Sequence, residues 1–198
     1  MLSRAADARL PTEHGEFLMR AYTENGGASP HLALVQGAVA GASAPIVRIH
    51  SECMTGDVFA SQRCDCGIQL EVALRMIGHE GVGVLIYLRQ EGRGIGLVNK
   101  LRAYNLQDGG LDTVDANLHL GFGADEREYG VALEILEDLG VDELRLLTNN
   151  PTKIAAFDAS SIRVVERVPL IVPVTDHNRR YIAVKHDRMG HLPIEAAR

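Results

Sequence analysis

The sequence predicts a mixed α/β fold, in which a β-rich, largely antiparallel N-terminal part is joined to an α/β core. In residues 1–60, short β-prone segments are separated by Gly, Pro and Asn turns, a pattern typical of antiparallel strands. From Gly67 onward, apolar residues with helical spacing alternate with continuous apolar runs, which favours strands buried between helices. This alternation of strand and helix indicates an α/β architecture for the second part.

A single domain is expected, because the chain has 198 residues, 46% of them hydrophobic, which suffices for one sizeable core. Within residues 1–198 we expect a β-rich part at 1–66, an α/β core at 67–172 and a polar C-terminal tail at 173–198. Neither an internal repeat nor an interdomain linker is evident.

The individual elements follow from these patterns. Four strands are expected in the N-terminal part, at Phe17–Thr23, Leu32–Gln36, Ile46–His50 and Asp57–Ser61. The helices expected in the core run from Ile68 to before Gly81, over Gly96–Leu106 and over Glu126–Leu139, with a short helix capped by Asn150-Pro151. The strands expected between them are Val82–Leu88, Leu144–Thr148 and Ile162–Val165.

The charge balance limits the possible partners. The formal net charge is −6, which argues against a general nucleic-acid binder, because such proteins need basic surface to displace counterions from phosphates. A negative net charge is still compatible with a small anionic substrate that binds in a local basic pocket. No apolar run approaches the roughly 18 residues of a membrane span, and the N-terminus lacks the apolar core of a secretion signal. We therefore expect a cytoplasmic protein with neither a membrane nor a nucleic-acid partner.

The three cysteines lie close together, as Cys53, Cys64 and Cys66 in the spacing C-x10-C-x-C. In the cytoplasm, clustered thiols are metal ligands more often than a disulfide framework. Three thiolates suit a zinc ion that keeps one position open, and such a site generates a nucleophile by lowering the pKa of water. A closed structural zinc site, with His50 or another histidine as fourth ligand, is the alternative on spacing alone.

A glycine-rich segment, RQEGRGIG at Arg89–Gly96, follows a buried strand. Its glycines allow close backbone approach, and the helix that follows favours an anion. Glu91 can accept hydrogen bonds from guanine, and Arg93 can bind phosphate in a bidentate manner. The alternative is an ordinary tight turn between a strand and a helix.

Two further segments contain candidate residues. Asp125 and Arg127 flank the expected start of a helix, where Asp125 could equally be an ordinary N-cap. Lys153 lies in the first turn of the helix capped by Asn150, an unfavourable place for a cation unless a phosphate binds there. The alternative for Lys153 is an exposed lysine without a role.

Together these segments closely resemble the GTP cyclohydrolase II family, whose members open the guanine ring of GTP for riboflavin synthesis. The resemblance runs from about Leu10 to His191 and rests on the ordered motifs RIHSEC-x10-CDCG, RQEGRGIGL-x-NK, DT-x-x-AN, GF-x-ADER and LTNNP-x-K. The chain departs from the family at Val184, where Thr is frequent. Many relatives carry an additional N-terminal domain that makes dihydroxybutanone phosphate, and with 198 residues we expect a single activity here.

The resemblance implies a role for each matching residue. Cys53, Cys64 and Cys66 would bind zinc. Asp125 would accept a proton, Arg127 would act on the α-phosphate as nucleophile or electrostatically, and Tyr104 would lie near the opening ring. The GTP contacts implied are Arg48, Ile49, His50, Ser51, Glu52, Gln69, Glu91, Gly92, Arg93, Thr113, Thr148 and Lys153.

The reaction that the resemblance implies is a hydrolysis of GTP. Zinc-activated water would attack C8 of guanine, formate would leave, and cleavage of the α–β phosphate bond would release pyrophosphate. The product would be 2,5-diamino-6-ribosylamino-4(3H)-pyrimidinone 5′-phosphate, with magnesium at the triphosphate and a homodimer as the assembly. Two alternatives stay open: a non-catalytic, zinc-stabilised nucleotide-binding protein, and a family relative with a different product or pathway.

Overall fold

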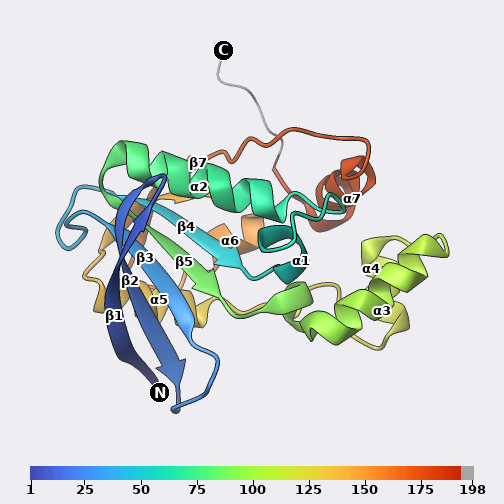
Figure 1. The fold of residues 1–198 in the computed structure, drawn as a ribbon, viewed down its shortest axis with the longest axis horizontal. Coiled ribbons are helices and arrows are strands. Elements are labelled where there is room, and N and C mark those ends of the chain that lie inside the picture. The colour runs from blue at the N-terminus through green and yellow to red at the C-terminus, as the bar shows by residue number, and fades with distance from the viewer. Residues whose placement is uncertain (193–198) are drawn as a thin grey trace.

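The computed structural model describes residues 1–192, and its centre is one seven-stranded mixed sheet in the order β1-β2-β3-β5-β4-β6-β7 (Figure 1). The strands are β1 (Leu2–Thr12), β2 (Gly15–Glu24), β3 (His31–Gln36), β4 (Ile46–Ser51), β5 (Gly83–Leu88), β6 (Glu143–Leu147) and β7 (Arg163–Val168). Strands β1, β2, β3 and β5 pair antiparallel in that order, whereas β4 is parallel to both β5 and β6, and β6 to β7. The mixed α/β fold is confirmed, and β4 joins the N-terminal part and the core into a single sheet.

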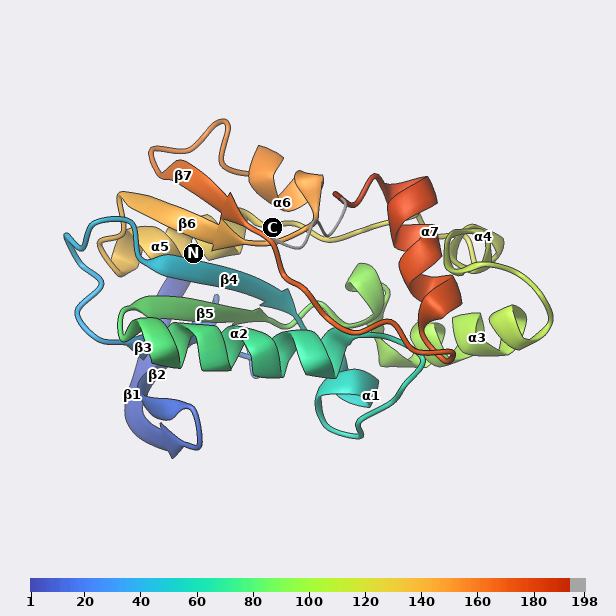
Figure 2. The ribbon, with the colours of Figure 1, turned by 90° about the horizontal axis from the view of Figure 1, so that it is seen from above.

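Helices cover both faces of the sheet and one of its ends (Figure 2). Helix α2 (Cys66–Glu80) lies across one face, and α5 (Gly130–Asp138) covers the opposite face. Helices α3 (Gly96–Asp108), α4 (Thr113–His119) and α7 (Arg179–Met189) gather beyond the carboxyl ends of β4 and β5. The short elements are α1 (Met54–Asp57), the 3-10 turn η1 (Glu91–Gly94) and α6 (Pro151–Ala155). None of the helices found between residues 1 and 192 is long and apolar enough to span a membrane.

Alternate residues of the central strands supply two hydrophobic cores. Val84 and Ile86 of β5 lie in the core beneath α5, together with Ile135. Leu85, between them in sequence, lies in the core on the other face with Ile77 of α2. Successive side chains of a strand point to opposite faces, so a strand covered on both faces needs a continuous apolar run. This is why VGVLIYL forms a central strand.

Most elements expected in the core are confirmed within a few residues, namely α2, β5, α3, β6, α6 and β7. The cap of α6 is confirmed as well, because Asn150 Oδ1 accepts a hydrogen bond from the Thr152 N–H at 2.9 Å.

One predicted strand is wrong, and one predicted helix starts later than expected. Asp57–Ser61 is not a strand, because the chain turns helical at α1 and the Asp57 side chain accepts the Cys53 N–H at 2.9 Å. The helix predicted over Glu126–Leu139 begins only at Gly130. Its expected start is not helical, and Asp125 binds the Arg127 side chain there rather than capping a helix.

Besides the short α1 and η1, the elements β1, α4 and α7 were not expected from the sequence. Strand β1 is an edge strand with mostly exposed residues, so it lacks the apolar face that marks a strand in sequence. Helix α4 is short, and Asp112 caps it by accepting the N–H groups of Val114 and Asp115. Helix α7 lies in the segment that the sequence describes only as a polar tail, and none of its residues is fully buried. The part of that tail at 193–198 lies outside the described residues.

Candidate functional site

Two adjoining pockets lie beyond the carboxyl ends of β4 and β5, with volumes of about 580 and 560 Å³. We name the first the cysteine pocket, after Cys53, Cys64 and Cys66. We name the second the cation pocket, after Arg48, Arg93, Arg127, Lys153 and Lys185. The two share Ser51, Cys66, Arg93, Arg127 and Tyr181, so they form one continuous site.

Nearly all residues that the sequence nominates line one of these pockets. Those at the cysteine pocket are Ser51, Glu52, Cys53, Cys64, Cys66, Glu91, Gly92, Arg93, Tyr104, Thr113 and Arg127. Those at the cation pocket are Arg48, His50, Ser51, Cys66, Gln69, Arg93, Arg127, Thr148 and Lys153. Ile49 and Asp125 line neither, since Ile49 is a core residue and Asp125 reaches the site only through Arg127.

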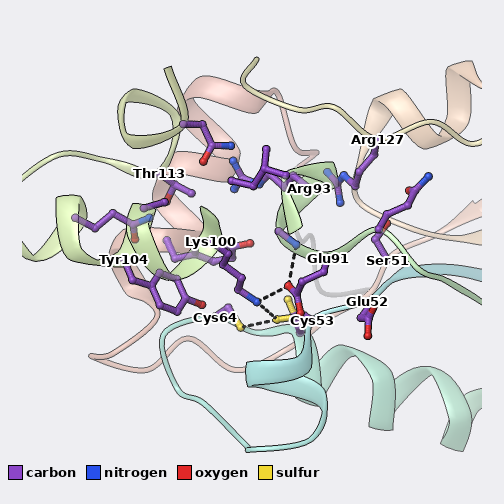
Figure 3. Close-up of a pocket in the computed structure, with 18 residues that line it drawn as sticks. Ser51, Glu52, Cys53, Cys64, Glu91, Arg93, Lys100, Tyr104, Thr113 and Arg127 are labelled. Atoms are coloured by element: carbon purple, nitrogen blue, oxygen red, sulfur yellow. Dashed lines mark hydrogen bonds and ion pairs between the residues drawn. The ribbon is translucent and has the colours of Figure 1, made fainter. Parts of the chain in front are cut away.

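The three cysteine sulfurs form one cluster at the cysteine pocket, and Figure 3 shows two of them, Cys53 and Cys64, side by side. All three lie within 4.8 Å of one another, and Cys53 Sγ is 3.7 Å from Cys64 Sγ. Tetrahedral zinc with Zn–S bonds of about 2.3 Å would separate two sulfurs by roughly 3.8 Å. The donor set and this spacing therefore fit a zinc ion. Among the described residues, this metal-ligand cluster includes no histidine.

Lys100 on α3 donates to the Cys53 sulfur at 3.0 Å and to Glu91 Oε1 at 2.8 Å, and it is buried. Hydrogen bonds from Cys64, Cys66 and Lys100 to the Cys53 sulfur lower the pKa of the Cys53 thiol. The same interaction with Cys53 raises the pKa of Cys64 to about 11. The ammonium of Lys100 therefore lies where it balances the charge of a Cys53 thiolate.

The Glu91 carboxylate is held from three sides. Its Oε1 accepts from Lys100 and, at 2.7 Å, from the Gly92 N–H, while its Oε2 accepts the Met54 N–H at 2.6 Å. These contacts connect the glycine-rich turn to α1, directly after Cys53. Glu91, the residue expected to recognise the base, therefore has a fixed orientation at the pocket. Its bond to Met54 connects it to the loop that carries Cys53.

His50 contacts a carboxylate, whereas the alternative of a closed zinc site would make it a metal ligand. Its Nε2 lies 3.1 Å from both Asp57 oxygens, and Asp57 also accepts from the Tyr87 hydroxyl and the Cys53 N–H, each at 2.9 Å. Burial lowers the pKa of His50, so the ring stays neutral and donates from Nε2. The network orients the backbone that presents Cys53, which makes His50 and Asp57 supporting residues of the cysteine cluster.

We expect Asp57→Ala to destabilise the protein by about 3 kcal/mol, because the substitution leaves several buried donors without an acceptor. Urea unfolding of the metal-loaded protein would measure the change. Glu71→Ala is the control, since Glu71 forms an exposed i,i+4 pair with Arg75 that contributes at most about 0.5 kcal/mol. A loss no larger than the control's would contradict the supporting role of Asp57.

Tyr104 lies beside the cysteine cluster, with its hydroxyl 3.4 Å from Thr55 Oγ1. Burial raises the pKa of Tyr104 to about 12. The phenol therefore keeps its proton at neutral pH and can donate a hydrogen bond into the pocket. Glu52, on the same pocket wall, forms an ion pair of 2.7 Å with Arg89.

Arg93 occupies a strained position at the border of the two pockets. Its backbone φ is +63°, which favours glycine, and Gly92 and Gly94 beside it are also left-handed. The side chain is buried, and neither terminal guanidinium nitrogen has a hydrogen-bond partner among residues 1–192. A strained backbone that presents an unpartnered buried cation points to a bound anion.

The floor of the cation pocket is formed by Arg48 and Lys153. Arg48 donates to the Leu147 carbonyl at 3.0 Å and to Gln69 Oε1 at 2.7 Å, and burial lowers its pKa to about 10. Lys153 donates to the Ile49 carbonyl at 2.7 Å and is 4% exposed, so the alternative of an exposed lysine without a role is wrong. Burial, together with Arg48 and Arg127, holds the pKa of Lys153 well below its ordinary value.

Asp125 and Arg127 form a bidentate pair, with Arg127 Nε donating to Asp125 Oδ1 at 2.7 Å and Nη2 donating to Oδ2. Burial alone would raise the pKa of Asp125, but the contact with Arg127 lowers it. Both oxygens of the carboxylate are therefore engaged, and Asp125 aims the guanidinium toward the shared part of the two pockets.

Several site residues were missed in the sequence. Lys100 belongs to the motif RQEGRGIGL-x-NK, which marked the residue as a candidate, but the motif alone did not indicate its role. Asp57 carries no signal, because its partners become neighbours only in the fold. Tyr181, Lys185 and His191 line the cation pocket from α7 and the residue stretch after it. Their segment is polar and was expected only as a tail, although Gly190 marks the end of α7.

Comparisons with known proteins agree with this site. A family model described as GTP cyclohydrolase II matches residues 3–169. The GTP cyclohydrolase-2 of Pseudomonas paraeruginosa is 54% identical over 187 residues, which cover 94% of this chain and 91% of that protein. The riboflavin biosynthesis protein RibBA of Chlorobium phaeovibrioides is 53% identical over 192 residues, which cover 97% of this chain.

The lengths of these relatives differ. The chain spans 47% of the RibBA protein, about half its length. A solved structure, RibBX, a two domain 3,4-dihydroxy-2-butanone 4-phosphate synthase from A. baumannii, is more distant, at 21% identity and a TM-score of 0.45. That match covers 82% of this chain and 39% of the other.

Proposed function

The chain belongs to the GTP cyclohydrolase II family, and from this we propose that it hydrolyses GTP in riboflavin synthesis. The proposed reaction opens the imidazole ring of guanine at C8 and releases formate. It also releases pyrophosphate from the triphosphate, leaving 2,5-diamino-6-ribosylamino-4(3H)-pyrimidinone 5′-phosphate.

The observation that carries the proposal is the buried positive charge of the cation pocket. Five cationic side chains line it, and no aspartate or glutamate of residues 1–192 does. Asp65 and Asp125 pair with two of the five, Lys185 and Arg127. Three buried cations are left without a carboxylate partner. Buried charge is costly unless it is paired, so the pocket favours a polyanion such as a triphosphate.

The cysteine pocket would receive the guanine end of the substrate. Cys53, Cys64 and Cys66 would hold zinc, which supplies Lewis-acid activation of water when it is bound. Lys100 keeps Cys53 and Glu91 in place, and Tyr104 offers a phenolic proton beside the cluster. Glu91 would accept from a guanine N–H group at Oε2, which receives a single hydrogen bond, from Met54, among the described residues.

The shared part of the two pockets would hold the α-phosphate. Arg127, aimed by Asp125, would neutralise charge that develops as the phosphoanhydride breaks. Arg48, Arg93 and Lys153 would bind the remaining phosphate oxygens. Magnesium would enter with the triphosphate, since this cation is commonly held by substrate phosphates and water, and no carboxylate of the described residues lines the cation pocket.

The test of the proposed function is incubation of the purified, reduced protein with GTP, zinc and magnesium, followed by identification of the products. Formate and pyrophosphate in equal amounts, together with the pyrimidinone, are expected. The absence of both would overturn the proposal and favour a zinc-stabilised nucleotide-binding protein. Release of pyrophosphate without formate, or of a different pyrimidine, would favour a family relative with another product.

Pyrophosphate binding should take up protons and weaken as the pH rises. In the free protein the pKa of Lys153 is lowered, and a bound polyanion raises it because it favours the charged ammonium. Affinity is therefore highest below the Lys153 pKa of the free protein and falls as the pH rises toward the pKa in the complex. Titration calorimetry in buffers of different ionisation enthalpy measures the uptake. Equal proton uptake by wild type and Lys153→Met would contradict this assignment.

The proposal also includes a homodimer, a cytoplasmic location and one domain over residues 1–198. Exposed apolar side chains one turn apart on α3, Val98 and Leu101, support a protein partner on that helix. Light scattering during gel filtration would give the assembly mass, and a monomer at micromolar concentration would contradict the dimer.

A further inference from the structure

Helix α7 forms a wall of the cation pocket, although it lies beyond residues 3–169 that the family model matches. Its Tyr181 and Lys185 face the pocket, and His191 follows on the same side. Because none of its residues is fully buried, the hydrophobic core does not account for where the helix lies.

Polar contacts attach α7 to both sides of the site. Arg180 donates to the Gly110 carbonyl at 2.8 Å, and Arg188 pairs with Asp112 and Asp115 of the α4 region. On the other side, the Leu192 N–H donates to the Asn149 carbonyl at 2.8 Å, directly after β6. The segment thus runs across the open side of the cation pocket.

Lys185 is the residue of α7 that is best placed to meet an anion. Its Nζ lies 2.6 Å from Asp65 Oδ1 and 4.6 Å from the centre of the Tyr181 ring, and its side chain is 13% exposed. An ammonium has three donors, so the single bond to Asp65 leaves others for a ligand. Burial lowers the pKa of His191, and the charge of Lys185 lowers it further.

Asp65 connects Lys185 to the residues already assigned to the substrate. It accepts from Gln69 at 2.6 Å, and Gln69 accepts from Arg48. Asp65 also lies between Cys64 and Cys66 in the chain. One chain of contacts therefore links α7, the floor of the cation pocket and the metal-ligand loop.

We propose that Lys185 binds a phosphate group of the substrate directly and that α7 completes the phosphate half of the site. This inference rests on the proposed function for the identity of the substrate, a nucleoside triphosphate. The contact itself requires only a polyphosphate in the cation pocket.

The experiment compares Lys185→Met, Lys185→Arg and the control Arg179→Met by GTP turnover and by calorimetric binding of inorganic pyrophosphate. We expect Lys185→Met to raise the KM for GTP and weaken pyrophosphate binding by at least about tenfold, the effect of one charge-assisted hydrogen bond. The kcat and zinc content should stay near wild type, and Lys185→Arg should restore most of the affinity. Arg179 lies on the same helix but is exposed, so Arg179→Met should behave as wild type.

Unchanged KM and pyrophosphate affinity in Lys185→Met would overturn the proposal, as would an equal loss in Arg179→Met. If Lys185→Met loses zinc because Asp65 is left unpaired, the double variant Lys185→Met/Asp65→Asn supplies the same comparison without a buried lone charge. The two proposals can fail separately. If the wild type does not turn over GTP, but binds pyrophosphate more tightly than Lys185→Met does, the proposed function is overturned and this inference stands.

Discussion

We expect the replacement of Cys66 with serine to abolish formate release and to empty the proposed metal site, while the cation pocket still binds pyrophosphate. A serine hydroxyl does not ionise at neutral pH and is a far poorer zinc ligand than a thiolate. Loss of zinc affinity should exceed about a hundredfold, the upper range for outer-shell substitutions around a metal. Metal analysis after dialysis and a formate assay measure the two effects.

The control for this substitution is Gln62→Ala, an exposed residue of the same loop, which should keep both zinc and activity. Pyrophosphate binding shows whether the variant is folded, since it depends on residues of the cation pocket. A variant that lost only its metal should still bind pyrophosphate, whereas an unfolded variant should not. A Cys66→Ser protein that retains zinc and releases formate at the wild-type rate would remove the cysteine cluster from the mechanism.

We expect the replacement of Arg127 with alanine to slow pyrophosphate release by about 10²–10³-fold, the range seen when one donor to a developing oxyanion is removed. Zinc content should not change, because Arg127 contacts Asp125 and not the cysteines. Arg127→Lys should recover only part of the rate, since lysine cannot reproduce the bidentate geometry. Quenched-flow measurement of pyrophosphate and formate separates the two halves of the reaction.

The matched control is Arg102→Ala, which removes an exposed arginine on α3. Its rates should equal those of the wild type. If Arg127→Ala also retained wild-type rates for both products, neither the nucleophilic nor the electrostatic role of Arg127 would survive.

Much of the fold and the site could be predicted because its signals are local. Helix α2 follows from apolar spacing between Ile68 and Gly81, and α6 follows from the Asn150 cap. The cysteines could be predicted to form one cluster, because the short chain segments between them limit the distance between their side chains. The errors have a physical cause as well: Asp57–Ser61 has strand-like residues, but the buried contacts of Asp57 favour a helical turn.

The pairing of charges could not be predicted in the same way. Lys100 lies 47 residues from its partner Cys53, and Lys185 lies 120 residues from Asp65. Asp125 has the sequence context of a helix cap, yet its carboxylate holds Arg127. Whether a carboxylate caps, pairs or meets a ligand depends on which side chains the fold brings within hydrogen-bond distance.

By itself the sequence determined the candidate metal-ligand residues, the glycine-rich turn and the family, because these depend on residue types at short, ordered spacings. Only the tertiary structure decided that His50 pairs with Asp57, that Lys153 is buried, and that α7 lines the cation pocket. Burial and ion pairing set the chemistry of a titratable group, and both arise from parts of the chain that are distant in sequence.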